Sequence, residues 1–329
     1  MSNTYLLGID VGGTAIKMAL FTKEGPMIKK WSIPTDKREK GSYIPDDIEM
    51  SVIKELENER ITLEQLEGVG LGVPGFVDIE NGTIEFAVNI GWRDFPLAKI
   101  LSKSLSVPVF LDNDANLAAA GEYWKGAGRS AKDMICFTIG TGVGGGVIVG
   151  GNIVHGVEGM AGEVGHITVD PFRGKTCNCG KTGCLETVAS ATGMVSSVIE
   201  KRENKEYPTS ILQSTSEEKL TTKEIFEAAA SKDPLATAVI EEAALYIGLA
   251  AANACTLLNP ERIVIGGGVS AAGEALLSPI QKYFQGYALE KVAKGTEFVI
   301  AELGNDAGVT GAAWLAAKSL GILPENYEK

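Results

Sequence analysis

The chain has 329 residues, of which 45% are hydrophobic and 22% charged, so it is typical of a soluble globular protein long enough for two domains. Its net charge of −12 argues against non-specific binding to nucleic acid or to an anionic membrane. The sequence opens into a predicted strand rather than a signal peptide, and the absence of an export signal predicts a cytoplasmic protein with reduced thiols.

The first motif is a hairpin near the start of the chain. An apolar strand is predicted over Tyr5–Asp10, and the turn Val11-Gly12-Gly13-Thr14 leads into a second strand, Ile16–Phe21. The backbone N–H groups of such a turn can cradle phosphate. The turn fits neither a Walker loop nor a dinucleotide fingerprint, because no helix follows it. A purely structural hairpin turn is the alternative.

A polar cluster is predicted where a buried strand meets a helix. The strand Pro108–Leu111 runs into Asp112-Asn113-Asp114-Ala115-Asn116, and an alanine-rich helix follows over Leu117–Trp124. Open α/β sheets place ligands at such strand ends. The alternative is that Asn113 or Asp114 only caps the helix. One cap needs one residue, however, and four polar residues stand here.

A second hairpin follows about 130 residues after the first. Residues Met134–Gly151 again give strand, Gly140-Thr141-Gly142 turn and strand, which is a weak internal repeat of the first hairpin. A later strand, Arg262–Ile265, runs into Gly266-Gly267-Gly268, which leaves room for a flat group or for backbone approach. A plain strand-to-helix turn would explain these three glycines equally well.

The stretch from Glu158 to Glu186 has the pattern of a metal site. It carries one of only two histidines and three of only five cysteines of the chain: His166, Cys177, Cys179 and Cys184. One imidazole and three thiols are the ligands of a closed tetrahedral zinc site. A disulfide would leave one thiol over, and a redox pair would have the spacing C-x-x-C. Ordinary buried thiols on a loop are the remaining alternative.

Two carboxylates flank the predicted metal loop. Glu163 precedes His166 by three residues, and Glu186 follows Cys184 by two. A metal anchored on both segments would fix these side chains relative to each other. Two acceptor groups held in this way suggest a site for a polyhydroxylated ligand. The alternative is that both are solvated surface charges.

The other predicted elements complete an alternation of strands and helices. A polar surface excursion is expected over Lys201–Thr222. The remaining predicted strands are Val69–Val73 and Phe298–Ala301, and the remaining helices are Ser42–Glu59, Thr222–Ser231, Pro234–Leu258, Ala271–Gly286 and Val309–Leu320.

Three glycine turns after three strands, with an acid leading the first, resemble the actin/Hsp70/sugar-kinase architecture. Seven motifs narrow the resemblance to the ROK family (repressor, open reading frame, kinase) and, within it, to its bacterial glucokinases. They stand in the family order over nearly the whole chain: GIDVGGT at 8–14, VPG at 73–75, NDAN at 113–116, GTGVGGG at 140–146, EGMAGEVGH at 158–166, CNCGKTGCLE at 177–186 and IGGGVS at 265–270.

The resemblance implies an α/β fold of two ribonuclease-H-like (actin-like ATPase) domains that flank a cleft, with the zinc-binding loop in the larger domain. The smaller domain would comprise residues 1–118, joined by the C-terminal helix at about 307–329. The larger domain, residues 119–306, would carry the dimerisation surface of a homodimer or homotetramer.

The resemblance also implies a role for each matching residue. Asp114 would be the general base. The sugar ligands would be Gly75, Asn89, Asn113, Asp114, Glu163, His166 and Glu186. The ATP-binding residues, with Asp10 near Mg2+, would be Asp10, Gly12, Gly13, Thr14, Lys17, Gly140, Thr141, Gly142, Gly266 and Gly267. His166 would bind structural zinc with Cys177, Cys179 and Cys184 and would also face the sugar.

The activity implied is the ATP-dependent phosphorylation of glucose to glucose 6-phosphate, with sugar and ATP as the partners. Another hexose (fructose, mannose or N-acetylmannosamine) is an alternative, because few contacts decide specificity. A sugar-responsive repressor is disfavoured by the net charge and by the lack of helices for DNA binding before the first strand. A silent sugar-binding protein is disfavoured because Asp10, Asp114 and the glycine turns are intact.

Overall fold

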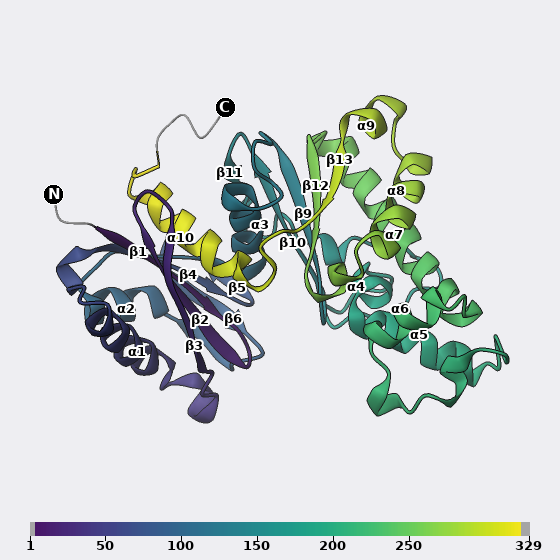
Figure 1. Cartoon of the computed structure of the whole chain (residues 1–329), viewed down its shortest axis with the longest axis horizontal. Helices are drawn as coiled ribbons and strands as arrows, with labels where there is room; N and C mark the ends of the chain where they lie inside the picture. Colours follow the sequence, from purple (N-terminus) through teal and green to yellow (C-terminus); the bar gives the residue numbers. More distant parts are fainter. Residues whose placement is uncertain (1–3, 324–329) are drawn as a thin grey trace. The chain divides into compact units, whose positions relative to one another are not determined.

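The protein is a mixed α/β chain that forms two compact units; the computed structural model describes residues 4–323 (Figure 1). Unit 1 comprises residues 1–130, 150–161 and 305–329, and unit 2 comprises 131–149 and 162–304. The sequence-based boundary near residue 118 falls inside helix α3 (Asp114–Lys125), which packs as a whole in unit 1. The domain ranges 1–118 with 307–329, and 119–306, therefore stay a prediction, and their last residues, 324–329, lie outside the described part.

Unit 1 is built on a five-stranded sheet in the order β3-β2-β1-β4-β8. The predicted first hairpin is confirmed, because β1 and β2 pair antiparallel, whereas β4 and β8 add parallel strands. The strands are β1 (Tyr5–Val11), β2 (Ala15–Thr22), β3 (Met27–Pro34), β4 (Leu66–Val73) and β8 (Val109–Asn113). A separate antiparallel sheet holds β5 (Phe76–Asp78), β6 (Thr83–Ala87) and β7 (Trp92–Phe95), and β11 (Asn152–Ile153) lies in the 150–161 segment.

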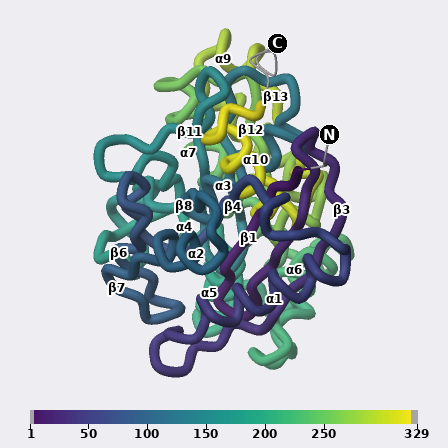
Figure 2. The backbone as a smooth tube through the Cα atoms, turned by 90° about the vertical axis from the view of Figure 1, so that its left-hand side faces the viewer, coloured from purple at the N-terminus to yellow at the C-terminus, as the bar shows by residue number. Residues whose placement is uncertain are grey.

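Helices cover both faces of this sheet because successive side chains of a strand point to opposite faces. On β1, Leu7 and Ile9 join one core cluster with side chains of α1 (Ile44–Asn58) and α2 (Leu97–Leu105). Leu6 instead joins a second cluster with side chains of α3 and of α10 (Ala307–Ser319). In Figure 2 the yellow α10 accordingly lies beside the purple β1 and the blue α3.

Glycines let α10 approach the sheet and α3 at backbone distance. A Cβ at Gly8 of β1 would lie 2.0 Å from the carbonyl oxygen of Val309, and one at Gly70 of β4 would lie 1.7 Å from that of Ala312. On the helix itself, a Cβ at Gly311 would lie 1.7 Å from the carbonyl oxygen of Leu117 on α3. Since backbone atoms cannot yield as side chains do, these positions admit only glycine.

The strands of unit 2 repeat the pattern of unit 1. They lie in the order β10-β9-β12-β13, where β9 and β10 form an antiparallel hairpin and the other two pairs are parallel. This matches β2-β1-β4-β8 and bears out the internal repeat. The strands are β9 (Met134–Ile139), β10 (Val143–Val149), β12 (Arg262–Gly266) and β13 (Glu297–Ile300).

Six helices of unit 2 are α4 (Glu186–Ala189), α5 (Ala191–Glu203), α6 (Thr222–Ala230), α7 (Pro234–Leu258), α8 (Glu274–Tyr287) and α9 (Glu290–Gly295). The predicted start of α8 at Ala271 is too early, because Gly268–Ala272 form a tight 3-10 turn that ends at Gly273 with a positive φ. By length and hydropathy α7 could span a membrane, but 61% of its apolar window is buried in the fold, as in a core helix.

Candidate functional site

The first glycine turn lies between β1 and β2 and is held by backbone and threonine contacts. The Gly12 amide donates to the carbonyl of Ala15 at 3.0 Å, and the Thr35 hydroxyl donates to the carbonyl of Gly12 at 2.7 Å. Asp10, the acid that leads the turn, lies opposite Lys17 in the ladder, with Oδ2 and Nζ 3.6 Å apart. Burial raises the pKa of Asp10, and the Lys17 ammonium opposes that shift. A cation beside this carboxylate would relieve the cost of its burial.

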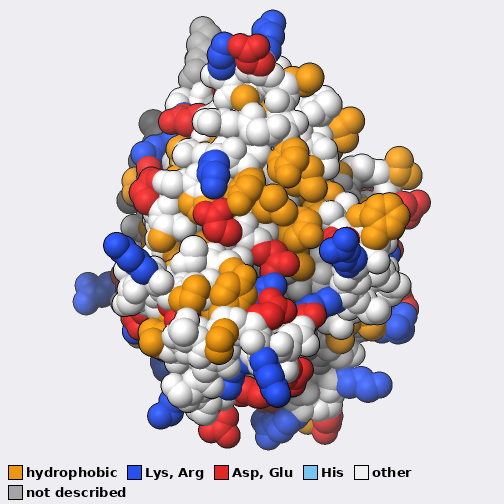
Figure 3. All heavy atoms as spheres, turned by 90° about the vertical axis from the view of Figure 1, so that its right-hand side faces the viewer, with side chains coloured by type: hydrophobic (Ala, Val, Ile, Leu, Met, Phe, Trp, Pro, Cys, Tyr) orange, Lys and Arg blue, Asp and Glu red, His pale blue; other side chains and the backbone are white. Residues whose placement is uncertain are grey.

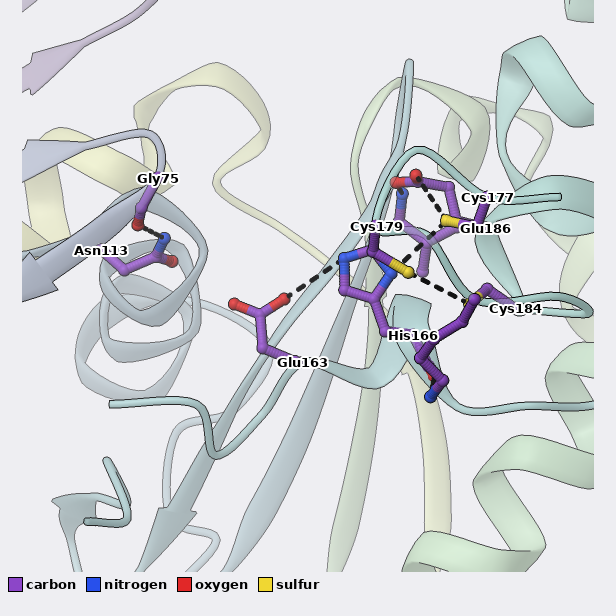
Figure 4. Close-up of polar contacts among 10 residues, drawn as sticks. Gly75, Asn113, Glu163, His166, Cys177, Cys179, Cys184 and Glu186 are labelled. Carbon is purple, nitrogen blue, oxygen red and sulfur yellow. Dashed lines mark hydrogen bonds and ion pairs between the residues drawn. The ribbon is translucent and has the colours of Figure 1, made fainter. Parts of the chain in front are cut away.

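The turn between β8 and α3 presents Asp114. Asn113 caps the helix, because its Oδ1 accepts from the amides of Ala115 at 2.8 Å and Asn116 at 3.3 Å. Its side-chain amide donates to the carbonyl of Gly75 at 3.0 Å (Figure 4). Asn113 is therefore the helix cap that the sequence offered as one interpretation, and it also links α3 to the β4–β5 turn, whereas its role as a sugar ligand stays a prediction. Asp114 is half-buried.

Two further predicted sugar residues occupy turns in unit 1. Gly75 has a φ of 107°, and a Cβ there would lie 2.2 Å from the carbonyl of Phe86, so the turn requires glycine. Asn89 is exposed and follows β6. A Cβ at Gly13 would lie 3.8 Å from the Cβ of Asn89, which places Asn89 beside the first glycine turn.

The second glycine turn lies between β9 and β10. The Gly140 amide donates to the carbonyl of Gly142 at 2.9 Å, and the Thr192 hydroxyl donates to the carbonyl of Thr141 at 2.9 Å. The next strand end, on β12, carries Gly266 and Gly267. Gly267 has a φ of 82°, and a Cβ there would lie 2.4 Å from the carbonyl of Ile139, so it packs against the end of β9.

The predicted metal loop closes on itself through two left-handed glycines. Gly180 and Gly183 have φ values of 87° and 78°, and the bridges Thr176–Thr182 and Thr168–Cys184 fasten the loop ends. The Cys177 amide also donates to the carbonyl of Lys181 at 2.8 Å. The segment with the C-x-C-x4-C spacing therefore folds into a short loop that brings its three cysteines together.

The four predicted ligands do converge in unit 2. The ligand atoms of His166, Cys177, Cys179 and Cys184 all lie within 4.8 Å of one another. The sulfurs of Cys179 and Cys184 are 3.6 Å apart. A tetrahedral zinc with Zn–S bonds of about 2.3 Å would hold its sulfurs about 3.8 Å apart. The donor set and its spacing therefore fit zinc.

The thiols are suited to a cation for a second reason. Burial raises the pKa of Cys177, and burial together with the neighbouring thiols raises that of Cys184 to about 12. Such thiols keep their protons unless a cation stabilises the thiolate, which is the form that binds metal. Cys179 is exposed, and the Lys181 amide lowers its pKa.

His166 presents its two ring nitrogens to different neighbours. Nδ1 lies 3.7 Å from the Cys177 sulfur, whereas Nε2 lies 4.0 Å from Oε2 of Glu163, as Figure 4 shows. A metal-binding imidazole commonly turns its second nitrogen to a carboxylate in this way. Burial raises the pKa of Glu163; His166 opposes the shift, and the carboxylate of Glu186 adds to it.

One polar pair in unit 1 was not predicted from the sequence. Asp112 of β8 is fully buried and contacts His155, the second histidine of the chain. Asp112 directly follows the predicted buried strand Pro108–Leu111, and an acid at this position is the signal that could have singled it out, because buried carboxylates need partners.

Comparisons with known proteins agree on one family. The model of the ROK family matches residues 6–319. The chain is 52% identical over 328 residues to a glucokinase of Halalkalibacterium halodurans, covering 100% of this chain and 99% of the relative. It is 35% identical to a glucokinase of Thermotoga maritima, covering 98% and 100%. A crystal structure of a ROK family glucokinase from Streptomyces griseus in complex with glucose and AMPPNP superimposes with a TM-score of 0.75 at 37% identity, covering 95% of this chain and 99% of that one.

Proposed function

Because the chain belongs to the ROK family, we propose that it transfers the γ-phosphoryl group of ATP to glucose and releases glucose 6-phosphate. The observation that carries this proposal is the full-length identity of 52% to a glucokinase. The motifs on which the resemblance rests lie at turns and strand ends of the two units.

Asp114 is the proposed general base. It is the first residue of α3. The side chain of Asn113 beside it accepts a hydrogen bond from the Ala115 amide and donates one to the carbonyl of Gly75. A carboxylate can accept the proton of the attacking sugar hydroxyl as the hydroxyl oxygen bonds to phosphorus and the bond to ADP breaks. The protein otherwise needs only to align the two substrates and to neutralise charge.

The proposed sugar ligands are polar side chains and one turn glycine. A sugar offers donors and acceptors together, and carboxylates, amides and an imidazole N–H complement both. Nε2 of His166 lies on the side of the ring away from the thiols, beside Glu163, which suits one residue for metal and sugar at once. The set is Gly75, Asn89, Asn113 and Asp114 in unit 1, and Glu163, His166 and Glu186 in unit 2.

ATP is proposed to bind at the glycine turns. Backbone amides there can stabilise charge on the phosphates, and Mg2+ is proposed near Asp10. The partly buried Asp10 carboxylate, whose pKa burial raises, supports a cation at this position. The proposed set is Asp10, Gly12, Gly13, Thr14 and Lys17 in unit 1, and Gly140, Thr141, Gly142, Gly266 and Gly267 in unit 2.

Zinc is proposed as a structural ion held by His166, Cys177, Cys179 and Cys184. When bound, it supplies no chemistry to the transfer but fixes the loop that carries the sugar ligands. The proposed sugar ligands, and not the zinc, orient the sugar.

The test is a coupled ADP-release assay with ATP and Mg2+ on glucose, fructose, mannose and N-acetylmannosamine in parallel. We expect turnover mainly on glucose. Preference for another of these hexoses would change the assigned substrate but not the assigned kinase activity. Absence of turnover on all four, with sugar binding intact, would replace the kinase by a non-catalytic sugar-responsive protein.

We also propose a cytoplasmic homodimer or homotetramer that assembles through unit 2. Hydrophobic side chains are exposed on one face of the molecule in Figure 3. In unit 2, Leu257 at the end of α7 is 86% exposed, and Leu289 between α8 and α9 is 63% exposed. Sedimentation of Leu257→Glu and Leu289→Glu beside the wild type tests this, and unchanged assembly in both would exclude this surface.

A further inference from the structure

A buried carboxylate stands two residues before the proposed base. Asp112 is 0% exposed and lies near the end of β8. Its Oδ1 accepts from the backbone amide of Asn113 at 2.7 Å and from the side-chain amide of Asn116 at 3.0 Å. Its Oδ2 lies 2.7 Å from Nε2 of His155. Because an ionised carboxylate only accepts hydrogen bonds, this contact fits a hydrogen bond from Nε2 of His155 to Oδ2 of Asp112.

His155 reaches this carboxylate from a distant segment of unit 1. It is 43 residues away in sequence, and its side chain is 31% exposed. Its carbonyl accepts from the amide of Ala161 at 2.9 Å, which closes residues 155–161 into a loop. The histidine thus ties this loop to the end of β8.

The hydrogen bonds of Asp112 and Asn113 fix the backbone on both sides of Asp114. Asp112 holds Asn113 and Asn116, which precede and follow the base, and Asn113 caps the same turn of α3. Loss of the His155 contact would leave one oxygen of a fully buried carboxylate without this donor. A rotation of Asp112 toward solvent would then pull on the peptide that leads into Asp114.

We propose that Asp112 and His155 form a positioning pair for Asp114. The pair holds the strand end so that the base points at the attacking hydroxyl, and neither residue touches the substrate. A buried polar pair is a poor source of net stability compared with apolar packing, and a fixed orientation is what it offers instead. The inference rests on the proposed function, since the base has a role only in the transfer.

Three variants of His155 test the pair. His155→Leu removes the donor, His155→Gln can place an amide N–H near the position of Nε2, and the shorter His155→Asn cannot reach it. Val157→Ala, on the same loop with 98% of the side chain exposed, is the matched control. For each variant, kcat, the KM for glucose and the melting temperature are measured.

We expect His155→Leu and His155→Asn to lower kcat by about 10- to 100-fold, with the KM for glucose within about threefold, as for a misplaced catalytic group. His155→Gln should recover most of the rate, and Val157→Ala should match the wild type. In an Asp114→Ala background, adding His155→Leu should lower kcat by less than about threefold, because the two residues act as one unit.

Distinct outcomes overturn the inference and the proposed function. A wild type without turnover on any hexose overturns the function, and the inference with it. An active wild type in which His155→Leu and His155→Asn keep a normal kcat overturns the inference alone. If His155→Leu does not fold, equal kcat values for His155→Gln and His155→Asn overturn it.

Discussion

Oε2 of Glu186 accepts a hydrogen bond from the backbone amide of Val143 at 3.0 Å. Glu186 begins α4 directly after the metal loop, and Val143 begins β10 directly after the second glycine turn. One side chain of unit 2 therefore joins the loop proposed to bind zinc to the turn proposed to bind phosphate.

This contact predicts that Gly142 cannot take even a methyl group without cost. A Cβ at Gly142 would lie 2.3 Å from Oε2 of Glu186, whereas one at Gly140 meets no atom within 4 Å. Gly142→Ala should push the carboxylate off the Val143 amide and destabilise the fold by about 1–3 kcal/mol. Urea unfolding of Gly142→Ala and Gly140→Ala measures this, and equal stability of the two variants would contradict it.

Loss of a thiol ligand should remove the metal and the activity together. We expect Cys177→Ser to lose its bound zinc and at least about tenfold in glucose phosphorylation, because the loop then no longer fixes Glu163 and Glu186. Metal content and rate are measured on the same preparation. Cys255→Ala is the control, since Cys255 is buried on α7 and burial raises its thiol pKa to about 11. Full activity in a zinc-free variant would refute a structural role for the metal.

Replacement of Asp114 should stop the transfer and spare the fold. General-base catalysis contributes about 10²- to 10⁴-fold, so kcat of Asp114→Ala should fall by that factor. The melting temperature should stay close to that of the wild type, since the cap on α3 comes from Asn113. Asp46→Ala, an exposed acid in the first turn of α1, serves as the control. A near-normal rate for Asp114→Ala would show that another group takes the proton.

Two glycine-to-alanine changes in helices should shift stability in opposite directions. Gly311→Ala on α10 would drive a Cβ to 1.7 Å from the Leu117 carbonyl, and we expect a loss of more than about 3 kcal/mol. Gly286→Ala lies near the end of α8 with no atom within 4 Å and should gain about 0.5–1 kcal/mol from helix propensity. Chemical denaturation measures the unfolding free energy of both variants. A Gly311→Ala variant as stable as the wild type would disprove the close contact of α10 with α3.

The N-terminus of α7 should depend on pH through Asp233. Burial raises the pKa of this carboxyl, but hydrogen bonds from Ala236, Ile211 and Ser210 outweigh burial, so the pKa lies below its ordinary value of 3.8. Its ionised form therefore stabilises the fold above that value, and the contribution is lost as the pH falls through the lower folded pKa.

Asp233→Asn should accordingly lower the unfolding free energy by about 1–3 kcal/mol at pH 7 and by less as the pH falls below 4. Unfolding curves from pH 7 to 3.5 measure the difference. Glu227→Gln, at an exposed ion pair with Lys223, should show almost none. A difference independent of pH would contradict the sign argued here.

The sequence predicted the glycine hairpins and the metal centre because their signals are local. The three cysteines of the metal loop lie within eight residues. The turns between β1 and β2 and between β9 and β10 are each formed by one continuous stretch of chain. The edge strand β3 was missed because charged residues such as Lys29 and Lys30 interrupt its pattern. The small sheet β5-β6-β7 was missed because its strands are short.

Contacts between residues that are far apart in the chain could not be predicted from the sequence. Nothing in it pairs Asp112 with His155, or Glu186 with the amide of Val143, because each pair forms only when separate elements pack. The general base, most sugar ligands and the ATP ligands were predicted from the family resemblance rather than from pattern, and they stay predictions.

The place of α10 in unit 1 has a consequence for synthesis of the protein. All strands of its large sheet have been synthesised once residue 113 is made, but α10, which covers Leu6 and meets Gly8 and Gly70, ends at residue 319. At about 5–20 residues per second, the roughly 200 intervening residues take about 10–40 s. During that interval the nascent sheet keeps an apolar face open to chaperones, and a chain truncated before α10 would never cover it.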